Sequence, residues 1–411
     1  MKTEEGLVAH GNLVDHLEGR RSEMVDLLHR LAELESPTTE PESQWPVMDL
    51  LARSLGDVGY RPRRFNGRKT GGQLLLRPPR GRRPGPYQVI VGHTDTVWPR
   101  GTLDTMPVEL DEHVLRGPGV FDMKGGLVQM VFALRALAEL GLEPSVTPVV
   151  FLNSDEELGS FESENRIHLL ASRADRAYVL EPALGLEGRL KTTRRGTGQF
   201  ELRVVGKSSH TGLAPGEGVS AIQEMGHIIH ALHRLSDPER GIGVNVGQVQ
   251  GGTRPNVVAA ECSAVVDVRV RTIADGRWVE EQILSLEPVT PGTEVHIEGS
   301  VDRPPMEGTP RNRLLWGAAR SAAALMGVEV EEGMSGGASD GNFTSLHTAT
   351  LDGLGSVGDG AHAVHEFVDV RRMPERAALL ALLLLVPPLP DPREVDGEPE
   401  AWDPFQVGGT L

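Results

Sequence analysis

Two patterns of apolar residues along the chain predict two kinds of sheet. Up to about residue 194 and again after 303, short runs of mostly apolar residues such as Val146–Leu152 occur between segments with helical spacing such as Leu127–Leu140. Such runs are typical of strands that are buried on both faces. We therefore expect an α/β domain in which helices cover a sheet of buried strands.

The segment between these two parts has a different pattern. Phe200–Val205 and Val265–Arg271 alternate apolar and polar residues, which is typical of antiparallel strands with one exposed face. Helical spacing is found at 219–235 and 276–286. We expect residues 195–302 to form a smaller α+β domain that is inserted into the first.

The insertion divides the chain into four parts. Residues 1–194 and 303–386 form the first domain, 195–302 form the inserted domain, and the Pro-rich, acidic tail 387–411 is expected to be poorly ordered. The other elements expected in the first domain are helices at 14–34, 46–58, 163–171, 311–326 and 374–385 and strands at 73–76, 87–91, 177–180 and 349–351.

Charge and composition narrow the classes of partner. The 411 residues carry a formal net charge of −17, which argues against a surface that binds nucleic acid or anionic membranes. Cys262 is the only cysteine, as is typical of a protein in the reducing cytoplasm. The first residues contain no apolar segment of a signal peptide, and the longest apolar run, Ala377–Val386, is too short to cross a bilayer. We expect a cytoplasmic protein that binds neither nucleic acid nor membrane.

Acidic residues follow the central apolar run. Val146–Leu152 leads directly into Asn153-Ser154-Asp155-Glu156-Glu157. Ligands of open α/β sheets bind at the carboxyl ends of strands, and adjacent carboxylates repel each other unless a cation or a shared proton relieves the repulsion. Taken alone, this stretch fits a solvated acidic turn at least as well as a ligand-binding site.

Further candidate ligands also follow strands or occupy glycine-rich turns. Imidazole and carboxylate groups together suit zinc or a similar divalent ion. The set has a surplus carboxylate, which favours two ions bridged by an acid. The candidates are His93, Asp95, Asp122, Glu156, Glu157, Glu181 and one or both of His362 and His365.

Six motifs in a fixed order connect the chain to a known family. Over residues 20–386 the chain resembles the zinc-dependent exopeptidases that include bacterial glutamate carboxypeptidase, acetylornithine deacetylase and succinyl-diaminopimelate desuccinylase, and glutamate carboxypeptidase is the most similar of these. The motifs are Gly92-His93-Thr94-Asp95-Thr96-Val97, Gly117-Pro118-Gly119 with Asp122-Met123-Lys124-Gly125-Gly126, Asn153-Ser154-Asp155-Glu156-Glu157, Glu181-Pro182, Gly206-Lys207-Ser208-Ser209-His210 and Gly360-Ala361-His362 with Glu366.

The resemblance implies a fold and a set of roles. It implies a catalytic domain with a mixed sheet between helices, an inserted lid domain through which the protein dimerises, and two bound divalent ions, both zinc. Glu156 is then the general base, Asp95 supports His93, and the peptide bond between Asp122 and Met123 is cis. The implied metal ligands are His93, Asp122, Glu157, Glu181 and His362, with Asp122 as the bridge.

Two of these assignments depend on single histidines. The family has its last ligand four residues before a glutamate, which fits His362 and Glu366 and leaves His365 as a rim residue. A loop histidine such as His210 is usually solvated when taken alone. The resemblance instead implies that His210 reaches the active site of the partner subunit and stabilises the oxyanion.

Arginines near the domain junctions are candidates for substrate binding. A guanidinium group can bind a carboxylate through two hydrogen bonds, but each arginine fits a surface or junction salt bridge equally well. Arg303 and Asn256 best match the substrate-binding positions of the family, and domain closure is expected to bring such groups over the metals. Gly336 and Gly337 lack the lysine of a phosphate-binding loop and are expected in a turn near the substrate. The substrate-binding candidates are Arg254, Asn256, Arg269, Arg303, Gly336 and Gly337.

These residues predict a dinuclear zinc hydrolase of the glutamate carboxypeptidase type. It would cleave the amide of an N-acyl amino acid or small peptide with a free C-terminal carboxylate, with Glu156 moving the proton from water to the leaving amine. An amino-acid N-deacylase is the alternative within the class. A non-catalytic binding protein on the same fold would be favoured by loss of Glu156 or of a ligand, and none is lost.

Overall fold

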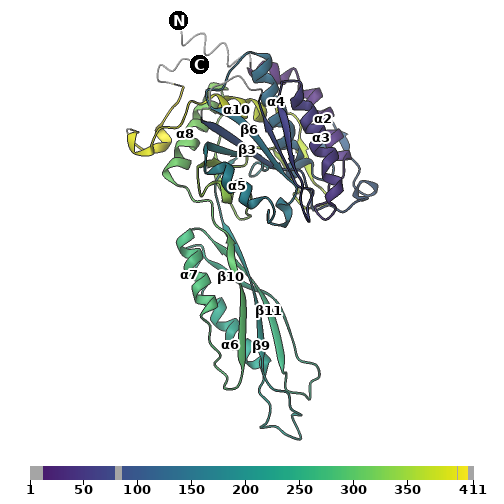
Figure 1. Cartoon of the computed structure of the whole chain (residues 1–411), viewed down its shortest axis with the longest axis vertical. Helices are drawn as coiled ribbons and strands as arrows, with labels where there is room; N and C mark the ends of the chain where they lie inside the picture. The colour runs from purple at the N-terminus through teal and green to yellow at the C-terminus, as the bar shows by residue number, and fades with distance from the viewer. Residues whose placement is uncertain (1–12, 79–85, 396, 406–411) are drawn as a thin grey trace. The chain divides into compact units, whose positions relative to one another are not determined.

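The computed structural model describes residues 13–78, 86–395 and 397–405 (Figure 1). The chain forms two compact units, which are described separately. Unit 1 contains the chain up to residue 193, 308–335 and the chain from 339 onward, and unit 2 contains 194–307 and 336–338. Unit 2 thus covers the segment expected as an insertion, extends to residue 307, and includes the three residues around Gly337.

Unit 1 is built around a six-stranded mixed sheet with the order β1-β2-β6-β3-β7-β14. The strands β3, β6, β7 and β14 are parallel, and β1 and β2 are antiparallel to their neighbours. In the parallel register His93 is opposite Asn153, so β3 and β6 end at the same edge. The bounds are β1 (Arg61–Phe65), β2 (Gln73–Arg77), β3 (Tyr87–His93), β6 (Thr147–Asn153), β7 (Ala174–Val179) and β14 (Ala349–Leu351).

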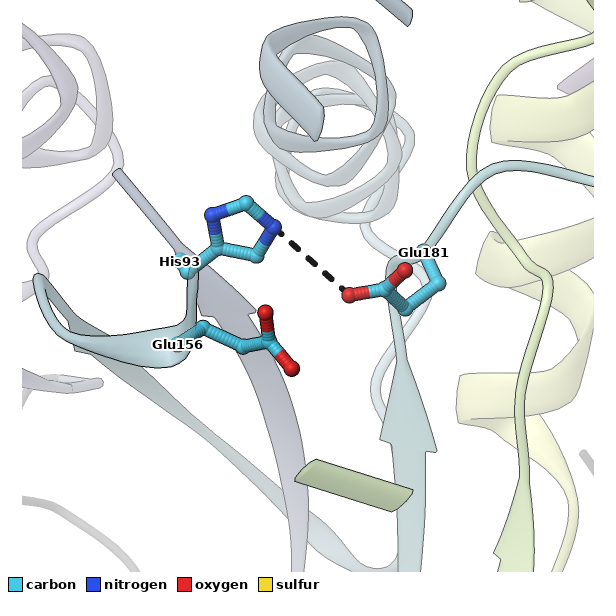
Figure 2. A group of neighbouring side chains, drawn as sticks. All are labelled: His93, Glu156 and Glu181. Carbon is cyan, nitrogen blue, oxygen red and sulfur yellow. Dashed lines mark ion pairs between the residues drawn. The ribbon is translucent and has the colours of Figure 1, made fainter. Parts of the chain in front are cut away.

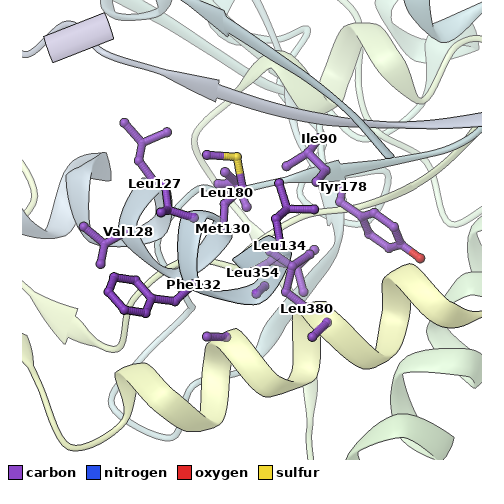
Figure 3. Close-up of a cluster of buried hydrophobic side chains, with 14 of the residues drawn as sticks. Ile90, Leu127, Val128, Met130, Phe132, Leu134, Tyr178, Leu180, Leu354 and Leu380 are labelled. Atoms are coloured by element: carbon purple, nitrogen blue, oxygen red, sulfur yellow. The ribbon is translucent and has the colours of Figure 1, made fainter. Parts of the chain in front are cut away.

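Helices cover both faces of this sheet, which explains the mostly apolar runs. Successive residues of a strand point to opposite faces, so Ile90 enters the core on one face, whereas Val89 and Val91 enter the core on the other. Figure 3 shows the first core, where Ile90 and Tyr178 of the sheet meet side chains of α4 and α10. The first face is covered by α2 (Arg21–Glu33), α3 (Gln44–Gly56), α4 (Gly125–Glu139), α8 (Pro310–Leu325) and α10 (Met373–Leu385), and the second by α5 (Glu164–Ala171) and α9 (Asp340–Thr344).

Two small sheets complete unit 1. A two-stranded sheet pairs β8 (Leu190–Arg194) with β13 (Glu332–Ser335), and a four-stranded sheet has the order β15-β16-β5-β4. Its strands are β4 (Glu109–Asp111), β5 (Val114–Arg116), β15 (Gly358–Asp359) and β16 (Phe367–Asp369).

Unit 2 is an antiparallel sheet with two helices on one face (Figure 1). Burial alternates along β9 as the sequence predicts, with Phe200, Leu202 and Val204 in the core. The hydroxyls of Ser220 and Thr272 accept hydrogen bonds from backbone amides of the first helical turns and fix where both helices begin. The order is β10 (Gly243–Gly251), β11 (Glu261–Val270), β9 (Gly196–Val205) and β12 (Glu294–Arg303), covered by α6 (Ala221–His233) and α7 (Ile273–Leu284).

Two expectations about regular structure are wrong. The helix expected at 14–34 is broken by a turn at Gly19 and Arg20, and α2 begins at Arg21. The tail is not poorly ordered where it is described, because Trp402 and Phe405 pack against the core and Arg313 Nε donates to Glu400 Oε2 at 2.7 Å. The expectations for residues 1–12 and 406–411 lie outside the described residues.

Within the described ranges, no helix combines the length and the apolar character needed to cross a bilayer. The expected cytoplasmic location stays a prediction.

Candidate metal centre and active site

The candidate ligands gather where three neighbouring parallel strands end. His93 is the last residue of β3, Glu156 and Glu157 follow β6, and Glu181 follows β7. Because these strands are parallel and adjacent, their carboxyl ends meet at one edge of the sheet. Figure 2 shows His93, Glu156 and Glu181 directed toward one another from these three segments.

One half of the cluster is centred on His93. Its Nε2 lies 3.2 Å from Asp122 Oδ1 and 3.6 Å from Glu181 Oε1. Its Nδ1 lies 2.9 Å from the backbone oxygen of Asp95 and donates to it when protonated. This hydrogen bond fixes the tautomer in which Nε2 offers its lone pair to the cluster, as metal-ligating histidines do.

The other half is centred on His362. Its Nε2 lies 3.1 Å from Glu157 Oε2 and 3.5 Å from Asp122 Oδ2. The turn that presents this ring is tight, with positive φ at Gly360 (83°) and at His362 itself (60°). His365 is exposed and has no part in the cluster, so the structure brings in the histidine that the motif selected.

Asp122 lies between the two halves. Its two carboxylate oxygens face two different histidines, as a bridging ligand requires. The peptide bond between Asp122 and Met123 is cis, which confirms the prediction from the resemblance. Helix α4 can begin this close to the strand ends because Gly126 has no side chain. A Cβ at this position would collide with the backbone oxygen of Leu180.

Asp95 supports the cluster differently from the expectation. Its carboxylate Oδ1 is 3.4 Å from His93 Nδ1, so the closer acceptor for His93 is the backbone oxygen of Asp95. Its Oδ2 accepts hydrogen bonds from Thr38 Oγ1 at 2.9 Å and from the backbone N–H of Glu157 at 3.2 Å. Asp95 therefore holds one ligand through its backbone and a second through its side chain.

Crowding of buried acids shifts the pKa values of the cluster. Burial raises the pKa of Glu157 to about 7, and the charges of Asp122 and Glu156 add to this, although His362 opposes it. The hydrogen bond with Glu157 raises the pKa of His362 to about 9. Burial opposes a charged His93, but its hydrogen bonds with Asp122 and Asp95 outweigh burial and raise its pKa. The protein thus stabilises positive charge at this point.

The cluster fits a divalent cation. In two sets of three residues, ligand atoms lie within 4.8 Å of one another: His93, Asp122 and Glu157, and His93, Glu156 and Glu181. Among the described residues, Glu157 Oε1 is buried and accepts no hydrogen bond, so it is oriented for a ligand that is not a protein donor. Nitrogen and carboxylate oxygen donors in this number are those that zinc takes in catalytic sites.

A cavity of about 300 Å³ adjoins the cluster within unit 1. Its wall includes two candidate ligands and one nearly buried cation, Lys191 of β8, which is 7 % exposed. The sequence analysis missed Lys191, because a single lysine in a strand carries no signal of its own. The cavity is lined by Phe121, Asp122, Glu181, Pro182, Ala183, Leu184, Gly185, Leu186, Lys191, Ser335, Gly358, Asp359 and Ala361.

Comparison with known proteins identifies the family. The sequence model described as peptidase family M20/M25/M40 matches residues 89–386. The chain belongs to this M20 family. It is therefore a hydrolase that acts on amide or peptide bonds, as the sequence predicted.

Relatives of the M20 protein include enzymes from both predicted branches. It is 26 % identical over 375 residues to carboxypeptidase G2 of a Pseudomonas species, and the alignment covers 88 % of each chain. It is 26 % identical over 384 residues to succinyl-diaminopimelate desuccinylase of Methylococcus capsulatus, covering 88 % of this chain and 98 % of the relative. The fold is similar to that of aminopeptidase PepT from Bacillus cereus, with a TM-score of 0.73, 21 % identity and coverage of 89 % and 98 %. The fold class predicted from the sequence is confirmed.

The residues expected to contact the substrate lie in unit 2. Two of them, His210 and Asn256, are neighbours there. His210 is exposed, and its Nδ1 accepts from the backbone N–H groups of Gly212 at 3.1 Å and Leu213 at 3.2 Å. These two contacts place the ring proton of the neutral form on Nε2, so that His210 can present an N–H donor. Nε2 lies 3.5 Å from the side-chain amide of Asn256, whose Nδ2 is itself a donor and does not accept this proton. Arg254 is exposed on the same loop as Asn256.

Arg269 and Arg303 lie at the other end of the unit 2 sheet. Both are opposite Thr197, on the strands that flank β9, so they share one cross-strand row. The guanidinium of Arg269 donates to both carboxylate oxygens of Asp267, each at 2.9 Å. Because of this pairing with Asp267, Arg269 fits the salt-bridge alternative. Arg303 is only 7 % exposed.

Gly336 and Gly337 are exposed in a loop that belongs to unit 2. Arg194 Nη1 donates to the backbone oxygens of Gly337 at 2.9 Å and Ala338 at 3.2 Å. The next residue, Ser339, is the N-cap of α9. The loop is fixed by these contacts, and its role toward substrate stays a prediction.

Proposed function

We propose that this M20 protein is a dinuclear zinc hydrolase that cleaves the amide bond of N-acyl amino acids or small peptides with a free C-terminal carboxylate. One observation carries the proposal: Asp122 Oδ1 lies 3.2 Å from His93, and Asp122 Oδ2 lies 3.5 Å from His362. Each histidine has its own glutamate, Glu181 on one side and Glu157 on the other. Each ion would be held by one imidazole, one glutamate and one oxygen of Asp122.

Glu156 is the proposed general base. When bound, the two zinc ions would polarise the scissile carbonyl and lower the pKa of the attacking water. Glu156 is half-buried beside His93 and Glu181 and is not one of the five residues proposed as ligands. It takes a proton from the water and passes it to the leaving amine, so that one carboxylate serves both steps.

Arg303 is the proposed contact for the substrate carboxylate. A planar guanidinium forms two parallel hydrogen bonds with a carboxylate, and its low exposure strengthens such a pair. The relative named carboxypeptidase G2 is consistent with recognition of a C-terminal residue. Arg303 is chosen over Arg269 because it best matches the substrate-binding position of the family and is nearly buried, whereas Arg269 is partly exposed and forms a salt bridge with Asp267.

The proposed oxyanion donor, His210, must then come from a partner subunit. His210 follows the end of β9, whereas Arg303 is opposite Thr197 near its start. Eight residues of extended strand separate these ends, or roughly 27 Å at about 3.4 Å per residue. The carbonyl and carboxylate of one amino acid are only a few ångströms apart, so both groups can act on one substrate only from two copies. In this proposal Arg254 and Asn256, which lie beside His210, act from the partner subunit, which supports a homodimer through unit 2.

A second candidate is hydrolysis of an N-acyl amino acid whose acyl group carries a carboxylate. Lys191 favours it, because this lysine lines the cavity beside Asp122 and Glu181 and is a cation suited to an anionic acyl group. The relative named succinyl-diaminopimelate desuccinylase fits the same chemistry.

A matched substrate panel tests both candidates. The zinc-loaded protein is assayed with N-acetyl and N-succinyl forms of several amino acids, each as the free acid and as the C-terminal amide. We expect free acids to be cleaved at least tenfold faster than amides, as for loss of a charged hydrogen-bonded contact. A preference for succinyl substrates that Lys191→Met removes would favour the second candidate. Equal rates for acids and amides would contradict carboxylate recognition.

A further inference from the structure

Glu366 is a buried carboxylate beside the metal cluster that the proposed chemistry does not use. It is 0 % exposed and accepts four hydrogen bonds from N–H groups. Its Oε2 accepts from Trp98 Nε1 and from the backbone of Gly119, each at 2.9 Å. Its Oε1 accepts from the backbone of Phe121 at 2.9 Å and of Asp122 at 3.0 Å. A buried carboxylate is stable only with such a set of donors.

Three of these four donors belong to one segment, Gly119–Asp122, which carries the bridging carboxylate. The segment is not a regular α-helix: Gly119 has a φ of 71°, and the π-helical turn Val120–Lys124 is interrupted at Asp122, whose φ of −111° and ψ of 98° are not helical, before α4 begins at Gly125. Its amides therefore donate to Glu366, which takes the place of helical carbonyl acceptors. The backbone position of Asp122 depends directly on Glu366.

The same residue closes the turn that carries His362. The backbone N–H of Glu366 donates to Ala363 O at 2.9 Å, and Gly117 N–H donates to Glu366 O at 3.4 Å. Glu366 also immediately precedes β16, which pairs with β5. It thus joins the turn of His362 to the segment of Asp122, the two parts whose side chains are 3.5 Å apart in the cluster.

We propose that Glu366 is a positioning residue that sets the spacing between Asp122 and His362 and so sets the affinity of the cluster for its second metal ion. The inference rests on the proposed dinuclear function. Glu366 contacts neither the cluster atoms nor the cavity; it acts through the backbone of Asp122 and through the turn of His362. Residues that orient metal ligands in this way commonly contribute a factor of about 10–100 to metal affinity.

The test is the zinc affinity of Glu366→Gln. Glutamine keeps the shape and one acceptor oxygen, but its NH₂ group faces two N–H donors. Zinc binding is measured by competition with a chromophoric chelator, alongside the Tm of the metal-free protein and kcat at saturating zinc. We expect the weaker of the two zinc sites to lose about 10–100-fold in affinity, and added zinc to recover part of kcat.

Glu224→Gln is the matched control. Glu224 is also 0 % exposed and accepts two backbone N–H groups, from Val289 and Thr290, but it lies in unit 2. We expect this variant to lose stability with unchanged zinc affinity. If Glu366→Gln does not fold, Glu366→Asp, which keeps the charge but shortens the side chain, is measured with the same expectation.

The outcomes separate the two proposals. If the wild type binds two zinc ions and a folded Glu366 variant binds both within twofold of wild type, the positioning role is wrong while the proposed function stands. If the wild type itself does not bind two ions, the proposed function fails, and the inference fails with it.

Discussion

In unit 1 the candidate ligands touch one another within a single subunit, whereas in unit 2 the candidate substrate residues are divided between two ends of a sheet. His93, Asp122 and Glu157 come from three segments, and their ligand atoms lie within 4.8 Å. His210 and Arg303 lie near opposite ends of β9. The cause is strand direction. Neighbouring parallel strands end at one edge, whereas an antiparallel sheet places successive loops at alternate ends.

This difference in strand direction suggests that one chain can form the metal centre, whereas the proposed substrate site requires two chains. Unit 1 can assemble a metal centre without a partner, since each of its ligands is already held by protein contacts. In the proposed function, the unit 2 of one chain would offer a given substrate either His210 or Arg303, and a complete site would need two chains. We therefore expect a substitution in the metal centre of unit 1 to inactivate the site of its own chain. A substitution of His210, in contrast, can be complemented by another copy of the chain.

The largest effect is expected at Glu156, within the assembled centre. Glu156→Gln keeps the shape of the side chain and removes the base, so kcat should fall by about 10²–10⁴-fold or more, since the same residue also serves the second proton transfer. Zinc content should be unchanged. A variant that retains a tenth of wild-type kcat would show that another group is the base.

His210 tests the separation into two copies. His210→Ala should lower kcat by about 10²–10³-fold, as expected for one oxyanion donor. Mixing this variant with Glu156→Gln should restore activity, because some heterodimers contain one site with both residues intact. Absence of recovery, with subunit exchange shown by mass, would mean that the site is not shared.

Arg303 and Arg269 form a matched pair in one cross-strand row. Arg303→Ala should lower kcat/KM by an amount equivalent to about 2–4 kcal/mol, and Arg303→Lys should recover only part of it. Arg269→Ala should change kcat/KM little, because its guanidinium is paired with Asp267. Equal losses for the two alanine variants would remove the reason for choosing Arg303.

The smallest effect concerns stability in unit 2 and has a defined pH dependence. Burial alone would raise the pKa of Glu224, but hydrogen bonds from Thr290 and Val289 outweigh it and lower this pKa. A lowered folded-state pKa stabilises the protein above the unfolded value of about 4.3, and this contribution is lost as pH falls below that value and through the folded-state pKa. Glu224→Gln should therefore cost about 1–3 kcal/mol at pH 7, and the Tm difference from wild type should shrink toward pH 3. A difference that does not change with pH would contradict the ionised role.

The sequence predicts unit 1 better than the details that depend on long-range contacts. The buried strands, the six motifs and the choice of His362 over His365 follow from residue order and agree with the structure. The packing of Trp402 on the core and the place of Lys191 in the cavity wall do not, because each depends on residues distant in sequence. In the sequence, Glu366 served only to select His362 as the ligand. Its hydrogen bonds could not be predicted, because the four donors precede it by more than 200 residues.

Zinc stoichiometry shows whether Asp122 is shared by two zinc ions. Metal-free protein is titrated with zinc while bound metal, Tm and hydrolysis of an N-acyl amino acid are measured together. We expect two equivalents per chain, a rise in Tm with binding, and weaker binding of both equivalents in Asp122→Ala. Saturation at one equivalent, or full hydrolysis in the presence of a strong chelator, would contradict it.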